Sequence, residues 1–208
     1  MNLKKKQHNK WILVILVVLG CSIWLWDGVI KDRVIPKRWG IVKQGKVYRS
    51  GQLSASLVEK TLKKNDIKVI VSLTGKVPDD PDQAAEQCAA DKLDIDLFRF
   101  GLGGDGTGDI EQYAQAIAVI VKAEKENKPV QVHCAAGTQR TGGVIACYRL
   151  LVKGDAPKDV LQEMKLYGWS PQENPKLLPF INKNMYHLAE RLQELGVIDT
   201  IPEPLPLL

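Results

Sequence analysis

Cysteine is scarce in this sequence, and its positions exclude the structures that depend on it. Among 208 residues there are four cysteines, Cys21, Cys88, Cys134 and Cys147, which share no close metal-ligand spacing. They are too few for a disulfide scaffold of this length. No internal repeat occurs, and 45% apolar with 25% charged residues excludes a disordered or fibrous chain. The length fits one globular domain with a short extension.

An excess of positive charge is missing from most of the chain, although the net charge is +5. Residues 1–40 contain eight Lys/Arg and two Asp/Glu, a net charge of +6. Residues 41–208 contain 21 Lys/Arg and 22 Asp/Glu, a net charge of −1. Nucleic-acid binding requires a basic surface, so we expect no nucleic-acid partner.

One long apolar run lies near the N-terminus. Residues Trp11–Trp26 are 16 uncharged, mostly apolar residues that follow a basic segment at 1–10. A bilayer core requires roughly 17–25 apolar residues, and flanking lysines and tryptophans favour a membrane over a buried soluble helix. We therefore predict a transmembrane anchor at 11–30 and a juxtamembrane linker at 31–40.

A second interpretation of this run remains open, in which Val18–Cys21 is a lipoprotein cleavage site and Cys21 carries the lipid. The residues after Cys21 stay apolar, which favours the retained anchor. Lys10 lies against the apolar run whereas Lys31 lies beyond its end, so positional charge favours a cytoplasmic N-terminus. We expect a single-pass protein of a bacterial inner membrane, with the rest of the chain outside the cytoplasm.

From residue 41 onward, strand-like and helix-like segments alternate. Short β-branched runs predict strands, and apolar residues at helical spacing predict helices. Ser54 and Asp109 are candidate helix N-caps. Because helices separate the strands, we predict an α/β fold: a mainly parallel central sheet flanked by helices on both faces, preceded by the transmembrane helix. The expected strands are Lys46–Tyr48, Ile67–Leu73, Ile95–Phe100 and Val130–His133, and the expected helices are Leu53–Asn65, Gln83–Lys92, Ile110–Asn127, Thr141–Lys153, Pro157–Leu166 and Asn174–Leu195.

The segment Val132–Gly142 lies between a predicted strand and a predicted helix, where ligands bind in open α/β sheets. The five residues between Cys134 and Arg140 are small or neutral, so their backbone N–H groups can converge on one tetrahedral oxyanion. The positive electrostatic field of these N–H groups also lowers the pKa of the Cys134 thiol, whose thiolate is the reactive form. Arg140 can grip two phosphate oxygens with its planar guanidinium. The candidate phosphate-binding residues are Ala135, Ala136, Gly137, Thr138, Gln139 and Arg140, supported by His133 and Thr141.

This string resembles the signature of the cysteine-dependent protein tyrosine phosphatase superfamily, in which His-Cys is followed by five residues, Arg and then Ser or Thr. The order of elements is similar to the small dual-specificity branch, and Val47–Gln52 is similar to the opening of many bacterial members. The resemblance covers about residues 41–190 and implies a phosphatase domain at 41–196, before an extended tail at 197–208. It implies a phosphocysteine intermediate on Cys134, formed without a metal or another cofactor.

The mechanism that the resemblance implies also requires a general acid, an Asp on a mobile loop well before the nucleophile. Asp105 and Asp109 precede Cys134 by 29 and 25 residues. Asp105 lies in a glycine-rich loop at 101–108 that is free to close over a substrate. Asp109 has an alternative role as a helix N-cap, so we select Asp105.

Two further residues keep alternative roles. Arg49 either supports the active-site loop or forms a surface ion pair. Cys88 either traps Cys134 in a reversible disulfide or is a small apolar helix residue. Cys147 lies on the apolar face of a predicted helix and is expected in the core.

The substrate is inferred from the charge of the loop. No residue between Cys134 and Arg140 is charged, which favours phosphotyrosine or another single phosphoester over an inositol polyphosphate. Lys76 or Arg99 could still supply basic groups to a phosphoinositide. The alternatives to a membrane-anchored phosphatase are therefore a phosphoinositide phosphatase and a non-catalytic phosphate-binding module. A sulfur-transfer or arsenate-reducing enzyme fits the His-Cys and Arg spacing less well.

Overall fold

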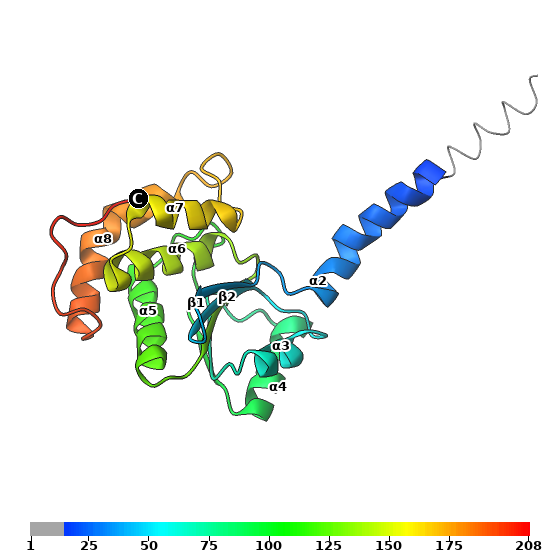
Figure 1. Ribbon diagram of the computed structural model, residues 1–208, viewed down its shortest axis with the longest axis horizontal. Helices are drawn as coiled ribbons and strands as arrows, with labels where there is room; N and C mark the ends of the chain where they lie inside the picture. Colours follow the sequence, from blue (N-terminus) through cyan, green and yellow to red (C-terminus); the bar gives the residue numbers. More distant parts are fainter. Residues whose placement is uncertain (1–14) are drawn as a thin grey trace, which may run out of the picture.

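The computed structural model describes residues 15–208 and places a five-stranded sheet between two groups of helices (Figure 1). The strands are β1 (Gly40–Lys43), β2 (Val47–Gly51), β3 (Val69–Ser72), β4 (Asp96–Arg99) and β5 (Val130–Cys134). The helices are η1 (Trp26–Ile30), α2 (Lys31–Val34), α3 (Val58–Lys64), α4 (Pro81–Leu93), α5 (Ile110–Lys125), α6 (Gln139–Tyr148), η2 (Arg149–Lys153), α7 (Pro157–Leu166) and α8 (Leu177–Glu194). This arrangement confirms the predicted α/β class with helices on both faces.

The sheet is mixed, which corrects the prediction of a mainly parallel sheet. Its strand order is β1-β2-β5-β3-β4, and β2, β5, β3 and β4 pair in parallel. β1, which the sequence did not predict, pairs antiparallel with β2. Only a short turn joins β1 to β2, and Gly45 in this turn has a backbone φ of +69°. A connection this short can only reverse the chain, because a parallel pair needs a long crossover.

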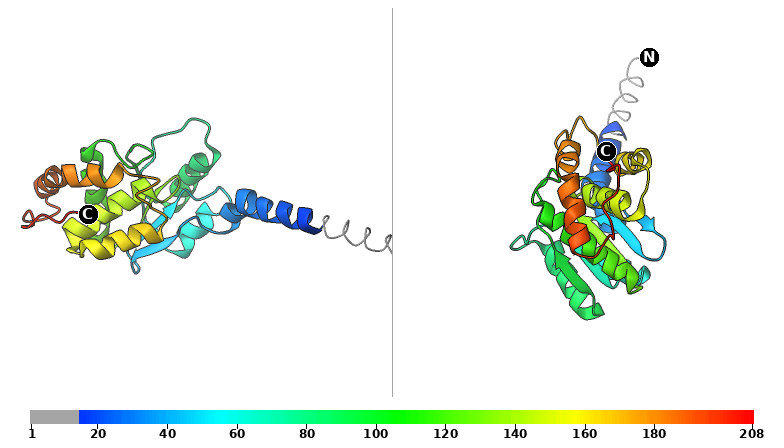
Figure 2. Two further views of the ribbon diagram at one scale, coloured as in Figure 1. Left: turned by 90° about the horizontal axis from the view of Figure 1, so that it is seen from above. Right: turned by 90° about the vertical axis from the view of Figure 1, so that its left-hand side faces the viewer.

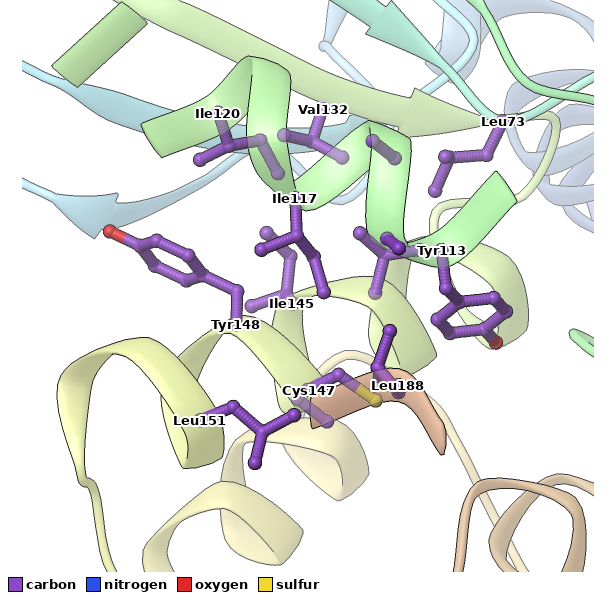
Figure 3. Close-up of a cluster of buried hydrophobic side chains, with 14 of the residues drawn as sticks. Leu73, Tyr113, Ile117, Ile120, Val132, Ile145, Cys147, Tyr148, Leu151 and Leu188 are labelled. Carbon is purple, nitrogen blue, oxygen red and sulfur yellow. The ribbon is translucent and has the colours of Figure 1, made fainter. Parts of the chain in front are cut away.

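Alternation along the strands explains why β3 and β5 are buried on both faces. Val69, Val71, Val130 and Val132 point to the larger apolar cluster, which α5, α6 and α8 cover (Figure 3). Ile70 points to the smaller cluster, which residues of α3 and α4 complete. The prediction that the β-branched run at 67–73 is a buried strand is therefore confirmed, although the strand is shorter than predicted.

Helix boundaries follow the capping residues more closely than the apolar spacing. Asp109 caps α5 by accepting a hydrogen bond from the N–H of Glu111 at 2.9 Å, as predicted. Ser54 does not cap α3, because the chain makes a turn at 54–57 and the helix starts only at Val58. Asp80 caps α4 and lengthens that helix beyond the predicted start.

The predicted transmembrane anchor is not supported by the residues that the structure describes. Residues 15–25 form an α-helix that continues through η1 and α2 and projects away from the sheet (Figure 2). Within 15–208, no helix is both long and apolar enough to cross a membrane. The physical reason lies in the sequence, because the apolar run is near the minimum length and the helix continues into the charged residues of α2. Residues 11–14 of the predicted anchor lie outside the described part.

Candidate active site

The loop that follows β5 lies at the carboxyl end of the sheet. β5 ends at Cys134 and α6 begins at Gln139. β2 and β3 flank β5, with Gly51 in register with Cys134 and Ser72 in register with His133. The predicted phosphate-binding loop is therefore held at the sheet edge where α/β proteins bind ligands.

The environment of Cys134 favours its thiolate. Cys134 is 1% exposed, and its Sγ accepts a hydrogen bond from the N–H of Gly137 at 3.1 Å. Burial alone would raise the pKa of the thiol, but the hydroxyl and N–H of Thr141, the charge of Arg140 and the N–H of Gly137 together lower this pKa. Within residues 15–208 the buried Thr141 hydroxyl makes no hydrogen bond to a nitrogen or oxygen. A thiol with a lowered pKa supplies the nucleophilic form at lower pH.

Arg140 lies in the first turn of α6, close enough for its charge to act on Cys134. Its Nε is buried and has no hydrogen-bond partner among the described residues. Buried donors are normally satisfied, so this unpaired guanidinium nitrogen beside a thiol of lowered pKa is available to bind an anion. The structure thus brings Cys134, Arg140 and Thr141 together, as the sequence predicted.

Gly137 is the position in the loop that tolerates no side chain. Its φ is +78°, and a Cβ there would lie 2.5 Å from the N of Gly51. The loop therefore packs directly against the end of β2, which only glycine permits. The carbonyl of Gly137 accepts a hydrogen bond from Arg49 at 3.2 Å.

Arg49 supports the active-site loop and is not a surface residue. It is 1% exposed, its Nη1 lies 2.9 Å from Glu163, and its guanidinium stacks 3.8 Å above the ring of Tyr167. These contacts hold the hydrogen bond to Gly137 in place. Glu163 and Tyr167 come from α7 and its C-terminal end, and no sequence motif marks them.

His133 lies behind the loop in a buried polar cluster. Its Nε2 is 2.8 Å from a carboxylate oxygen of Glu86 on α4, and both residues are at most 2% exposed. The other oxygen of Glu86 accepts from Arg99 at 2.9 Å, and Arg99 also donates to Ser72. Burial raises the pKa of Glu86, but His133 and Arg99 outweigh it and hold this pKa below its ordinary value. Arg99 is therefore engaged behind the loop and is not a free basic group for a substrate.

Arg38, a basic residue from the predicted linker, contacts the phosphate-binding loop. Nη1 of Arg38 donates to the carbonyl of Ala136 at 2.9 Å. The carbonyl of Lys37 accepts from the N–H of Gly51 at 2.7 Å. Sequence reasoning missed this contact, because nothing in the local pattern ties residues 37 and 38 to a loop that lies almost a hundred residues later.

The two candidate acids lie in different environments. Asp109 is exposed and caps α5. Asp105 lines a cavity of about 380 Å³ together with Gln139 of the phosphate-binding loop. Its carboxylate accepts from the hydroxyl and N–H of Thr107 at 2.7 and 3.1 Å, and these hydrogen bonds lower its pKa. The structure thus places Asp105 in a cavity beside the predicted phosphate-binding loop, and Asp109 at the N-cap of α5.

The cysteines of the described region are all unpaired. Cys88 is exposed on α4 and lines a larger cavity with Lys76, so the structure contains no disulfide between Cys88 and Cys134. Cys147 is in the core as predicted, and burial raises its pKa to about 12. No group of three or more potential metal ligands occurs in residues 15–208.

The chain matches a family model described as "DSP-PTPase phosphatase fused to NAD+ Kinase" over residues 29–176. Because the match covers more than half of the chain, the protein belongs to this family of dual-specificity and tyrosine phosphatases.

Curated relatives agree with this assignment. A dual specificity protein phosphatase of vaccinia virus (strain Copenhagen), OPG106, is 35% identical over 74 residues, which are 35% of this chain and 43% of the viral protein. The probable tyrosine-protein phosphatase DG1060 of Dictyostelium discoideum is 31% identical over 118 residues, 56% of this chain and 68% of that protein. The chain thus spans less than half the length of the viral relative.

Solved structures share the fold. TpbA of P. aeruginosa has a TM-score of 0.60 at 22% identity, and the match covers 75% of this chain and 91% of the TpbA chain. The core catalytic domain of the PP-IP phosphatase SIW14 from S. cerevisiae has a TM-score of 0.59 at 17% identity. This match covers 76% of this chain and 94% of the SIW14 chain. At these identities the likeness establishes the α/β architecture alone.

Proposed function

We propose that this protein hydrolyses phosphotyrosine or other phosphomonoesters through a phosphocysteine intermediate on Cys134. The observation that carries the proposal is the buried Cys134 sulfur, with a lowered thiol pKa, beside the unpaired Nε of Arg140. Arg140 and the N–H groups of residues 135–139 would hold the three non-bridging phosphate oxygens as charge develops on them. The loop would not need to change its conformation as the charge develops, because Arg49 and the close packing of Gly137 hold it in place.

The reaction has two steps. The Cys134 thiolate attacks phosphorus and forms an S–P bond while the P–O bond to the leaving group breaks, and Asp105 protonates the departing oxygen. Water then attacks phosphorus, Asp105 takes its proton, the S–P bond breaks and inorganic phosphate leaves. The hydroxyl of Thr141 stabilises the departing thiolate.

Asp105 must alternate between its two protonation states in this cycle. Hydrogen bonds from Thr107 lower the pKa of Asp105 and hold it as a carboxylate, which is the form that the second step requires. Release from Thr107 would raise this pKa toward the ordinary value, and the negative charge of a bound phosphoester beside the carboxyl group would raise it further, which favours the protonated form that the first step requires. A glycine-rich loop supplies the freedom for that movement.

The substrate class follows from charge around the loop. The five residues after Cys134 are uncharged, which supports a single phosphoester such as phosphotyrosine. One structural neighbour, TpbA, was solved in complex with pTyr, whereas SIW14 is described as a PP-IP phosphatase. A phosphoinositide phosphatase is the second candidate, because Arg38 adds a cation at Ala136.

Turnover separates the phosphatase from a non-catalytic phosphate-binding module. The full chain should release p-nitrophenol from p-nitrophenyl phosphate, with the same rate in the presence of a metal chelator. Binding of phosphate without release of p-nitrophenol would favour the binding module. A phosphotyrosine peptide compared with a phosphoinositide at equal concentration then distinguishes the two substrate classes.

Replacing the candidate acid should slow only the substrates that need protonation. We expect Asp105→Asn to lower kcat for a poor leaving group, such as a phosphotyrosine peptide, by about 10²–10⁴-fold. The loss should be much smaller for p-nitrophenyl phosphate, whose leaving group needs little protonation. Asp109→Asn is the matched control. If Asp109→Asn shows this pattern and Asp105→Asn does not, the acid is Asp109.

We also propose that residues 11–30 attach the protein to a membrane. The support is the exposure of the apolar side chains at 15–19 and 23–26, since an apolar surface of this extent usually marks a contact with a membrane or a partner. Extraction of the full chain by salt without detergent would contradict the attachment.

A further inference from the structure

The connection between α7 and α8 contacts the loop that carries Asp105. Asn174 lies in this connection and is 4% exposed. Its Nδ2 donates to the backbone carbonyl of Asp105 at 2.9 Å, across 69 residues of sequence. Asn174 therefore holds the main chain of the candidate acid and leaves the carboxylate itself untouched.

The next carbonyl in the loop is held by a residue that is close in sequence. The hydroxyl of Tyr113 donates to the carbonyl of Gly106 at 2.5 Å. Figure 3 shows Tyr113 at one end of the apolar cluster, with its hydroxyl pointing away from the other labelled side chains. Because Tyr113 is on the helix that directly follows the loop, it fixes the loop only relative to α5. Asn174 connects the loop to a distant element by a hydrogen bond to its main chain, and Lys176 of the same connection lies 3.9 Å from the Asp105 carboxylate.

The amide of Asn174 is only half satisfied. With Nδ2 directed at Asp105, its Oδ1 is buried and lacks a hydrogen-bond partner within the described residues. An unpaired buried amide oxygen is unfavourable, so fold stability alone does not account for an asparagine at this position.

The same side chain shares a cavity with the acid and with the phosphate-binding loop. Asn174, Asp105 and Gln139 line one cavity of about 380 Å³. A Cβ at Gly106 would lie 3.2 Å from the carbonyl of Gln139, which shows how closely the acid loop approaches the phosphate-binding loop. Small shifts of the acid loop would therefore change the reach of Asp105.

We propose that Asn174 is a positioning residue that holds the main chain of Asp105 against the phosphate-binding loop, so that the Asp105 carboxyl group reaches the leaving oxygen. The proposal rests on the assignment of Asp105 as general acid. Displacement of a reacting group by about 1 Å can cost about 10²-fold in rate. Loss of the hydrogen bond should thus affect protonation of the leaving group and leave phosphate binding unchanged.

The test compares leaving groups in the full chain. We expect Asn174→Ala to lower kcat for a phosphotyrosine peptide by about 10–10²-fold, with KM within about twofold of the parent. Turnover of p-nitrophenyl phosphate should fall by less than about threefold. In the Asp105→Asn background, adding Asn174→Ala should change the peptide rate by less than about threefold, because both residues act through one step.

Two variants control for folding. Asn184→Ala removes a similar amide donor on α8, which binds the carbonyl of Phe180 at 2.8 Å, and should keep the parent rates. Asn174→Asp keeps the shape of the side chain and replaces its Nδ2 donor by oxygen. If Asn174→Ala fails to fold, Asn174→Asp must reproduce the selective loss.

The outcomes separate this inference from the proposed function. Equal losses for both substrates, or effects of Asn174→Ala and Asp105→Asn that multiply, would overturn the positioning role and leave the Asp105 assignment intact. If Asp105→Asn itself shows no dependence on the leaving group, both assignments are overturned.

Discussion

Cys134→Ser should lower phosphatase turnover by about 10⁴-fold or more and leave phosphate binding nearly unchanged. A serine hydroxyl is far less acidic than a thiol, so the contacts that lower the pKa of Cys134 cannot supply an alkoxide. The N–H groups of the loop and the guanidinium of Arg140 remain, so the oxyanion site persists. Turnover of p-nitrophenyl phosphate measures the first effect, and calorimetric titration with inorganic phosphate measures the second.

Cys88→Ser is the matched control for this substitution. Cys88 is exposed on α4 and lies outside the phosphate-binding loop, so its replacement should keep the parent rate. A Cys134→Ser variant that retains a tenth of the parent rate would show that another group is the nucleophile. Loss of activity in Cys88→Ser would instead give that cysteine a role that the structure does not indicate.

Arg140→Lys should have the second largest effect, although it keeps the charge. Removal of one oxyanion donor typically costs about 10²–10³ in kcat, and a lysine replaces two parallel donors by a single ammonium. The lysine chain also cannot reproduce the planar geometry that holds two phosphate oxygens together. We therefore expect kcat to fall by about 10²–10³-fold and vanadate affinity to fall with it.

Arg191→Lys provides the comparison on α8. Arg191 pairs with Glu111 and Glu194 and contributes nothing to the phosphate-binding loop, so this variant should match the parent in both assays. Vanadate affinity near the parent value in Arg140→Lys would contradict the role of Arg140 as a phosphate clamp. A loss in both arginine variants would indicate a general effect on folding.

The phosphate-binding loop could be predicted because its parts are adjacent in sequence. Cys134, Gly137 and Arg140 lie within seven residues, and the strand before them and the helix after them have clear patterns. The N-cap at Asp109 was predictable for the same reason, since a cap acts on residues two or three positions later. Local geometry determines such features, and local sequence reveals them.

The strands were predicted with less accuracy where tertiary contacts determine whether a strand forms. β1 is short and half-exposed, and it exists because the turn around Gly45 brings it beside β2. The prediction of a membrane-spanning helix likewise rested on an apolar count close to the minimum. The structure shows the helix continuing into charged residues, a property that the apolar stretch alone does not reveal.

The support of the loop could not be predicted, because its residues are distant in sequence and belong to no motif. Arg49, Glu86 and Asn174 are polar residues whose sequence neighbours say nothing about their partners. Each is buried because a hydrogen bond or an ion pair with a distant group offsets the loss of water. Only the packed fold specifies which groups meet.

The sequence by itself thus determined the chemistry of the candidate site: a cysteine and an arginine on one short loop between a strand and a helix. The tertiary structure decided which residues hold that loop and its acid in place. It brings Arg49 into contact with Gly137, Glu86 with His133 and Asn174 with Asp105. The physical reason is distance along the chain. A loop's conformation depends on its own residues, whereas a buried polar contact depends on which faces the sheet and helices bring together.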